Sequence, residues 1–231
     1  MNMSMTADGK IATTNRVISS FSSKRDHNHL LSLRATADAV MCGARTVDLN
    51  KVNLGPGGPK YRKLRLKRGL VESNLRIIVS GSGTLDPNAH IFRNAAASDK
   101  GAVKNPSPII ILTSARAGKA RIAKLRAVAN EVKVFGKKRP DLRAALKWLH
   151  QKWNVRRLIC EGGGELNDAM FRAGLVDELY LTLCPRIIGG SKAPTIADGL
   201  GFPKLAKAEQ LKLKTLKQSK NELFLTYTRD R

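Results

Sequence analysis

Short apolar segments alternate with longer amphipathic segments along most of this chain. Residues 75–79 and 108–112 are largely apolar and too short for a helix, so they predict buried strands. Residues 141–153 carry Leu142, Leu146 and Leu149 on one side, which predicts a helix. Such alternation of strands and helices is typical of an α/β protein with a mostly parallel sheet.

Weaker patterns extend this prediction over the rest of the chain. The turn signal Ala7-Asp8-Gly9 ends a first strand within 1–12, and the Gly/Pro-rich, basic residues 51–68 predict a loop. The last stretch, 211–227, predicts an antiparallel hairpin that turns near 219–221 and completes the sheet. The other expected strands are 37–43, 132–135, 155–160 and 179–183, and the other expected helices are 27–34, 119–130 and 166–173.

Three consecutive glycines, Gly162, Gly163 and Gly164, follow the strand expected at 155–160. Without side chains the backbone approaches a ligand closely, and the next helix offers its N–H groups and its dipole to a phosphate. A tight turn that needs glycine only for its dihedral angles explains the same residues equally well. The spacing is not G-x-G-x-x-G, so an ordinary Rossmann domain is not indicated.

Length and composition point to one domain over residues 1–231. The hydrophobic fraction of 42% is ample for one sizeable core, and no long linker divides the chain. No apolar run approaches the roughly 20 residues of a membrane helix. Three scattered cysteines, Cys42, Cys160 and Cys184, are typical of reduced core residues in a cytoplasmic protein, and no metal spacing is present.

The strongly basic composition is the unusual property of this sequence. Lysine and arginine number 42 against 18 acidic residues, a formal net charge of +24, which attracts polyanions and phosphorylated ligands. The basic residues are spread along the chain, and their densest cluster is KYRKLRLKR at 60–68. Only 5% of the residues are aromatic, which disfavours a stacking platform for nucleic acid. We therefore favour a solvated basic surface over a nucleic-acid-binding one.

Four motifs together resemble the reductase domain of riboflavin biosynthesis, and the resemblance covers nearly the whole chain. They are SMTADGKIA at 4–12, LRATADAVMCGARTV at 33–47, RIIVSGSGTLDP at 76–87 and CEGGGELNDAMFRAGLVDELYLTLCPRIIGG at 160–190. The resemblance implies a dihydrofolate-reductase-like three-layer sandwich. It also implies an NADPH-dependent oxidoreductase that reduces the ribosylamino sugar of a diaminopyrimidinone 5′-phosphate, or its 5-amino-uracil equivalent, to the ribityl form.

The same resemblance implies roles for individual residues and a homodimeric state. For the cofactor it implies contacts at Ser4, Thr46, Asn50, Gly81, Gly162, Gly163, Gly164, Glu165 and Leu166. For the substrate it implies contacts at Arg34, Glu161 and, more loosely, Arg62. An arginine holds a phosphate bidentately, and the carboxylate of Glu161 accepts hydrogen bonds from the amino groups of a diaminopyrimidine. Without the resemblance, a surface arginine and a helix-start carboxylate would explain Arg34 and Glu161.

Two departures from the family pattern bear on the substrate and the cofactor. The family usually has aspartate where this chain has Asn50, which keeps an acceptor oxygen and loses the charge. The Gly/Pro-rich loop at 55–61 is also unusual. The ligands of the zinc deaminase that accompanies some members, H-x-E with P-C-x-x-C, are missing from the sequence, so we expect a reductase alone and no metal.

Mechanism and alternatives follow from these assignments. Hydride passes from the reduced nicotinamide to C1′ of the opened imine, and no histidine or carboxylate is nominated as a general acid. A strand end followed by a basic helix, Thr113, Ser114 and Arg116, is a candidate for the 2′-phosphate of the cofactor. One alternative is a pterin or dihydrofolate reductase on the same fold. Another, from a different class, is a nucleic-acid-binding protein without turnover.

Overall fold

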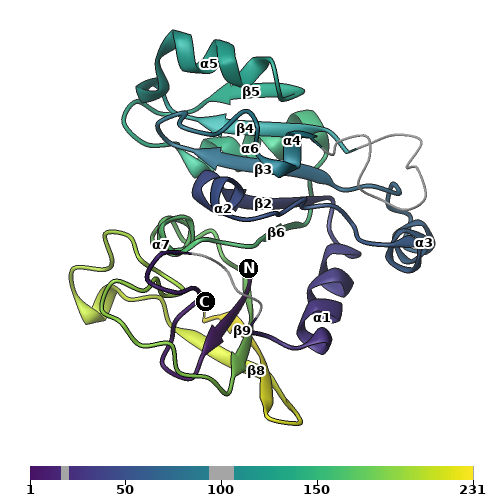
Figure 1. Ribbon diagram of the computed structural model, residues 1–231, viewed down its shortest axis with the longest axis vertical. Coiled ribbons are helices and arrows are strands. Elements are labelled where there is room, and N and C mark those ends of the chain that lie inside the picture. Colours follow the sequence, from purple (N-terminus) through teal and green to yellow (C-terminus); the bar gives the residue numbers. More distant parts are fainter. Residues whose placement is uncertain (17–20, 94–106, 231) are drawn as a thin grey trace. The chain divides into compact units, whose positions relative to one another are not determined.

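A computed structural model describes residues 1–16, 21–93 and 107–230 of the chain. The described chain falls into two compact units, each taken here by itself (Figure 1). The terminal unit combines Met1–His29 with Cys160–Arg231, and the central unit is Leu30–Ile159. The borders between the units fall inside helix α1 and strand β6.

The terminal unit is built on a four-stranded sheet in the order β1-β7-β9-β8. β1 runs parallel to β7, whereas β7, β9 and β8 are successively antiparallel. Its elements are β1 (Asn2–Thr6), the first part of α1 (Lys24–Arg34), α7 (Gly164–Arg172), β7 (Glu178–Cys184), the 3₁₀ turn η2 (Leu205–Lys207), β8 (Leu211–Ser219) and β9 (Glu222–Arg229).

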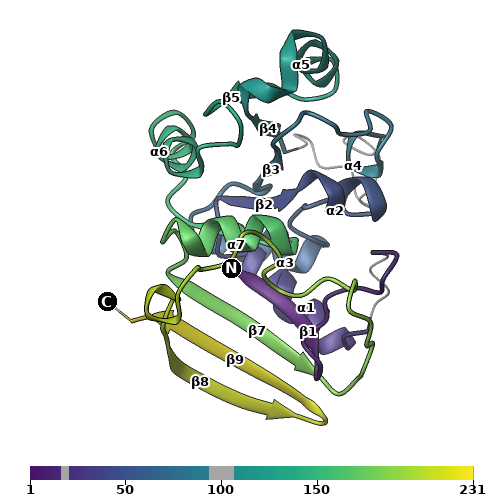
Figure 2. The ribbon, with the colours of Figure 1, turned by 90° about the vertical axis from the view of Figure 1, so that its left-hand side faces the viewer.

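One face of this sheet is apolar from edge to edge. Met3 is paired with Leu181, Leu181 with Leu225 and Leu225 with Leu216, so their side chains share that face. α7 lies over the β1–β7 side of the sheet, as Figure 2 shows, and Leu181 is buried there. Towards β8 the cover ends, because Leu216 is 57% exposed.

An irregularity in β8 adds a second leucine to the uncovered part of the apolar face. The register shifts between Leu213 and Thr215, which is a β-bulge centred on Lys214. The extra residue leaves Leu213 opposite Tyr227 and Leu216 opposite Leu225, so both leucines share one face although they are three residues apart. Leu213 is 53% exposed. We call Leu213, Leu216 and the half-buried β9 residues Leu223, Leu225 and Tyr227 the leucine face.

The central unit is built on a second sheet, in the order β5-β4-β3-β2-β6, in which β2, β3, β4 and β5 are parallel. Its elements are the last turn of α1, β2 (Ala39–Gly43), α2 (Ala44–Leu49), α3 (Pro59–Lys67), β3 (Leu75–Ser80), α4 (His90–Arg93), β4 (Ile109–Thr113), the 3₁₀ turn η1 (Ala115–Ala117), α5 (Gly118–Arg126), β5 (Glu131–Val134), α6 (Leu142–Trp153) and β6 (Leu158–Cys160).

Most strands of this sheet are continuous apolar runs in the sequence, because helices cover both faces of the sheet. Figure 2 shows α6 on one side of the sheet and α2 and α4 on the other. The core on the α2 and α4 side takes alternate residues of each strand, such as Cys42, Ile78 and Ile111, all fully buried. Leu149 of α6 is also fully buried.

The structure confirms the α/β class, the mostly parallel sheet and the C-terminal antiparallel hairpin, and corrects three details. The hairpin β8–β9 pairs through β9 with β7, in a sheet separate from the parallel sheet of the central unit that it was expected to complete. Residues 59–67 form helix α3 where a loop was expected, because Pro59 is accepted in a first helical turn and the following residues are good helix formers. The short helix α2 was also not predicted. Within the described ranges, no helix has both the length and the apolar character to cross a membrane.

Candidate functional site

The glycine turn in the terminal unit joins Cys160 to helix α7. Gly162 has φ of +84°, a conformation that L side chains rarely adopt, and its peptide bond to Gly163 is cis. A Cβ on Gly162 would also lie 2.9 Å from the sulfur of Met3. The conformation and packing of the protein's own chain therefore already require glycine at this position, which is the tight-turn interpretation.

Gly164 is glycine because another loop packs against it. A Cβ there would lie 2.6 Å from the carbonyl oxygen of Thr195 and 2.9 Å from Asp198 Oδ2, and the Asp198 N–H donates to the Gly164 carbonyl at 3.0 Å. Asp198 in turn accepts from the N–H of Thr195 at 2.9 Å and from its hydroxyl at 2.6 Å. The segment Thr195–Gly201, which we call the covering loop, is thus built against the glycine turn.

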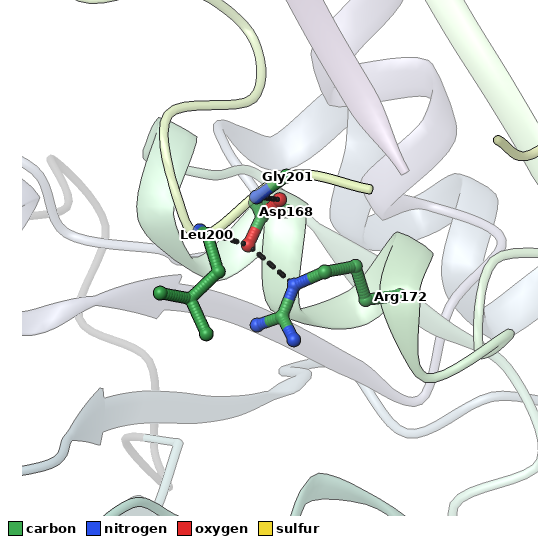
Figure 3. A network of polar contacts seen from close by, with 4 residues as sticks. All are labelled: Asp168, Arg172, Leu200 and Gly201. Carbon is green, nitrogen blue, oxygen red and sulfur yellow. Dashed lines mark hydrogen bonds and ion pairs between the residues drawn. The ribbon is translucent and has the colours of Figure 1, made fainter. Parts of the chain in front are cut away.

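Two buried side chains of α7 hold the covering loop. Asn167 donates from Nδ2 to the Ile196 carbonyl at 2.8 Å. Asp168, only 4% exposed, accepts from the N–H of Leu200 and of Gly201, each at 3.0 Å, and pairs with Arg172 Nε at 2.8 Å (Figure 3). Sequence reasoning did not single out either residue. Only Asn167 carried a signal, because it falls between Met170 and Phe171 on the apolar side of the helix, where a polar side chain needs a buried partner.

The start of α7 retains the features that suit a phosphate. Its N-cap is Gly163, and no side chain caps the first turn. Backbone N–H groups and the positive end of the helix dipole are directed there. The N–H of Leu166 donates to the Gly163 carbonyl at 3.0 Å, and the Leu166 side chain is buried, so this residue contributes packing. Glu165 is exposed in the first turn and Glu161 is half-buried before the glycines.

Ser4 has a partner that the sequence did not reveal. Its hydroxyl donates to Asp26 Oδ2 at 2.7 Å, and Asp26 is 7% exposed at the start of α1. The Asp26 N–H in turn donates to Ser23 Oγ at 3.3 Å, which is the geometry of a serine N-cap before α1. A hydroxyl has a single proton, and that of Ser4 is donated to Asp26. Ser4 can therefore only accept a hydrogen bond from a ligand.

In the central unit, Arg34 is oriented by the Gly/Pro-rich loop. Its Nη1 donates to the Gly55 carbonyl at 2.8 Å, and the side chain is 7% exposed at the end of α1. The loop is itself fixed, because Leu54 is buried and its carbonyl accepts from Asn74 Nδ2 at 2.8 Å. A guanidinium presents five donors in a planar fork, which is the geometry that suits a phosphate.

Arg62 lies on the buried side of α3, 6% exposed, with its Nε 3.7 Å from Glu72 Oε1. Burial of Arg62, and of Arg65 on the same helix, differs from the solvated surface expected for the basic cluster at 60–68. The remaining basic residues of this helix, Lys60, Lys63 and Lys67, are exposed.

Thr46 and Asn50 are linked at the end of α2. Asn50 donates from Nδ2 to the Thr46 carbonyl at 3.1 Å and follows the helix as its C-cap. A carboxylate cannot donate this bond, and its charge would face the negative end of the helix dipole. The hydrogen bond to Thr46 therefore explains why asparagine is suited to position 50, where the family pattern has aspartate.

The strand end at Gly81 and the candidate 2′-phosphate residues share a set of hydrogen bonds. Thr113 Oγ1 donates to the Ser80 carbonyl and Ser114 Oγ donates to the Gly81 carbonyl, each at 2.6 Å. Both hydroxyl protons are thus committed to the backbone of β3, and both side chains are fully buried. Of the three candidates, only the exposed Arg116 retains a side-chain donor for an anion.

All three cysteines are free and buried, and this makes a testable prediction. Burial raises the pKa of Cys160 to about 11, and burial together with the Glu222 charge raises that of Cys184 to about 12. The folded state holds these thiol protons more tightly than the unfolded state. The resulting contribution to the free energy of unfolding is therefore complete below the ordinary thiol pKa of about 8.5 and is lost as the pH rises through 11. At pH 8 we expect Ellman's reagent to label no cysteine of the native protein within minutes, and all three in guanidinium chloride. Rapid labelling without denaturant would contradict the buried positions.

Comparison with known proteins agrees with these features. Residues 1–225 match the family model of the RibD C-terminal domain. The chain is 33% identical over 228 residues to the 2,5-diamino-6-ribosylamino-4(3H)-pyrimidinone 5′-phosphate reductase of Methanothermobacter thermautotrophicus, covering 99% of this chain and 96% of the relative. The enzyme of the same name from Archaeoglobus fulgidus is 32% identical over 211 residues, which is 91% of this chain and 90% of the relative.

Solved structures show the same fold. A pyrimidine reductase-like protein from Corynebacterium diphtheriae superposes with a TM-score of 0.77 at 25% identity, covering 100% of this chain and 90% of its own. The riboflavin biosynthesis reductase Rib7 of Saccharomyces cerevisiae superposes with a TM-score of 0.68 at 13% identity, covering 99% and 88%.

Proposed function

Because the chain belongs to the RibD C-terminal domain family, we propose that it reduces 2,5-diamino-6-ribosylamino-4(3H)-pyrimidinone 5′-phosphate with NADPH in riboflavin biosynthesis. The observation that carries this proposal is the 33% identity over 99% of the chain to a reductase of that name and of nearly equal length. We also propose that the whole chain, 1–231, acts as one reductase domain in the cytoplasm. Free thiols at all three cysteines support the cytoplasmic location.

For the cofactor, the residues proposed in the terminal unit are Ser4 and the glycine turn from Gly162 to Leu166. The uncapped start of α7 suits a diphosphate, so the residues present fit the group. When bound, the reduced nicotinamide supplies the hydride. The chain's own part is to orient it through backbone N–H groups and to hold the turn rigid through the covering loop. In the central unit the residues proposed are Thr46, Asn50 and Gly81.

For the substrate, we propose that Arg34 and Arg62 bind the 5′-phosphate and that Glu161 accepts hydrogen bonds from the pyrimidine amino groups. The two arginines are 7% and 6% exposed, and a charge-assisted hydrogen bond is strongest at such buried positions. C1′ of the opened imine takes the hydride and its nitrogen takes a proton, which gives the ribityl amine.

The proposal is tested by incubating the protein with the ribosylamino substrate and either NADPH or NADH, following the loss of absorbance of the reduced nicotinamide. We expect turnover with NADPH at the lower KM and no turnover with dihydrofolate. Absence of oxidation above background with either nucleotide would contradict the reductase assignment. Neither the pterin reductase nor the nucleic-acid-binding alternative is favoured by the relatives, and a salt-dependent RNA complex without NADPH affinity would be required for the latter.

We further propose that two copies of the chain associate through the leucine face. These five side chains are uncharged in a protein whose net charge is +24, and Arg229, the next residue of β9 in the same alternation, is paired with Glu209 at 2.6 Å. Two such chains repel each other through most of their surface, so an uncharged apolar patch is where they would meet with the least repulsion. A symmetric dimer pairs the same patch on both copies.

Leu216→Glu is expected to convert the dimer to a monomer, because it places two charges in that contact. Since Leu216 is 57% exposed in the single chain, the thermal midpoint of the monomer should change little. Lys217→Glu is the control on the opposite face of the same strand. The measurement is the mass by light scattering at a concentration of about 100 μM. A wild-type monomer, or a Leu216→Glu dimer, would refute this interface.

A further inference from the structure

Helix α3 has a buried side that is basic. Tyr61, Arg62 and Arg65 are buried, whereas Lys60 and Lys63 between them are exposed. Arg62 and Arg65 are three residues apart and therefore lie on the same side of the helix. Arginine rarely occupies a fully buried position, and Arg65 is 0% exposed.

The guanidinium of Arg65 is bound only to backbone carbonyls. Nη1 donates to the carbonyls of Arg34 at 2.7 Å and Ala37 at 2.6 Å, and Nε donates to that of Val71 at 2.9 Å. Arg68, one turn further on, donates to the Ala35 carbonyl at 3.2 Å. These contacts satisfy carbonyls that follow the last turn of α1, at the negative end of that helix.

This arrangement is costly for stability alone. Among the described residues no carboxylate forms an ion pair with Arg65, on which the charge of Asp38 acts only at longer range, and its Nη2 is buried without a hydrogen-bond partner. An unsatisfied buried donor disfavours folding by about 1–3 kcal/mol, and apolar residues of similar volume often replace buried ionic groups without loss of stability. The cost therefore points to a geometric role rather than a stabilising one.

One hydrogen bond of Arg65 is made to the backbone of Arg34, whose guanidinium is a proposed ligand of the phosphate. Arg65 holds the backbone of Arg34, and Arg34 holds Gly55 through its own guanidinium at 2.8 Å. On the same helix, one turn before Arg65, is Arg62. Arg65 thus provides the two shortest hydrogen bonds between α3 and the end of α1, beside the bond from Arg68 and the packing of Tyr61 on Leu31 and Ala35.

We infer that Arg65 is a positioning residue, which sets the separation between Arg34 and Arg62 so that both guanidinium groups bind one phosphate of the substrate. This inference rests on the proposed function, because it takes Arg34 and Arg62 as the ligands of the 5′-phosphate. Arg65 itself does not touch the substrate. Helix α3 would thus both supply Arg62 and, through Arg65, position Arg34 for substrate binding.

The test compares Arg65→Met and Arg65→Lys with Lys63→Met, an exposed position on the same helix. For each we would measure kcat, both KM values, the thermal midpoint and the inhibition constant of ribose 5-phosphate. Arg65→Met is expected to raise the KM of the phosphorylated substrate and the inhibition constant by about tenfold or more, because misplacement by 1 Å is enough for such losses. The KM for NADPH should stay within about twofold, and Lys63→Met should match the wild type in every measurement.

If Arg65→Met does not fold, Arg65→Lys is the variant that tests the inference. Lysine keeps the positive charge, but its ammonium group cannot donate to the three carbonyls that the planar guanidinium binds. A substrate KM for Arg65→Lys equal to that of Lys63→Met would overturn the inference, as would a lower thermal midpoint with unchanged KM. Failure of the proposed function shows separately, as no turnover by the wild type. In that case thermal stabilisation by ribose 5-phosphate, present in the wild type and absent in Arg65→Lys, still reports on the positioned pair.

Discussion

Gly199→Ala is expected to destabilise the protein by about 3 kcal/mol, through overpacking and the loss of buried hydrogen bonds. A Cβ on Gly199 would lie 1.8 Å from Asp168 Oδ2 and 2.7 Å from its Cβ. The Asp168 carboxylate would have to leave the N–H groups of Leu200 and Gly201, which it now accepts at 3.0 Å. Because the covering loop packs on Gly164, NADPH affinity should fall as well.

The measurements are the urea midpoint of unfolding and the dissociation constant of NADPH. Gly58→Ala is the matched control: it is the same change, at a glycine whose φ is −68° and whose Cβ would meet nothing within 4 Å. Because Gly58 is the N-cap of α3, where glycine is preferred to alanine, the control should lose no more than about 1 kcal/mol. Equal effects of the two substitutions would show that the covering loop does not depend on Asp168.

Arg34→Met is expected to lower kcat/KM for the phosphorylated substrate by about 100-fold, the loss of two charge-assisted hydrogen bonds at roughly 1.5 kcal/mol each. The loss should fall on KM more than on kcat, because the phosphate is remote from the carbon that is reduced. NADPH affinity should change little. Methionine retains most of the buried volume of the side chain while removing the donors.

Arg25→Met provides the control, since it makes the same change at an exposed residue of the same helix. Steady-state kinetics with both substrates varied, and binding of inorganic phosphate, are the measurements. If Arg34→Met lowered only the thermal midpoint, through its bond to Gly55, and left the substrate KM unchanged, the phosphate assignment would be wrong.

Local patterns predicted the elements well because most elements carry their own signal. β4 and α6 lie within one or two residues of their predicted ranges, since their apolar residues follow a strand or helix period without interruption. The helix α3 was missed because four glycines and prolines precede it, and a count of turn residues extended the loop over Pro59, which begins the helix. The division into two sheets was missed because strand pairing depends on contacts far apart in sequence.

The candidate site was predictable only as far as residue types are diagnostic. Arg34 and the glycine turn were identified through whole motifs, whereas Asp168, Asn167 and Arg65 act through backbone atoms of segments that no motif connects to them. At Gly162 and Gly164, packing of the chain against itself explains the glycines without reference to a ligand. A sequence pattern does not distinguish a cradle for a phosphate from a close approach of two backbone segments.

The division of the terminal unit between both ends of the sequence has a consequence for biosynthesis. The ammonium group of Met1 bonds the carbonyl of Glu178 across 177 residues, and β1 is completed by β7. At roughly 5–20 residues per second, a ribosome needs about 10–35 s to make the intervening chain. Throughout that interval β1 has both edges unpaired, whereas the strands of Leu30–Ile159 find their partners within that segment as it is made. The strand β1 is therefore the segment that a chaperone would have to shield.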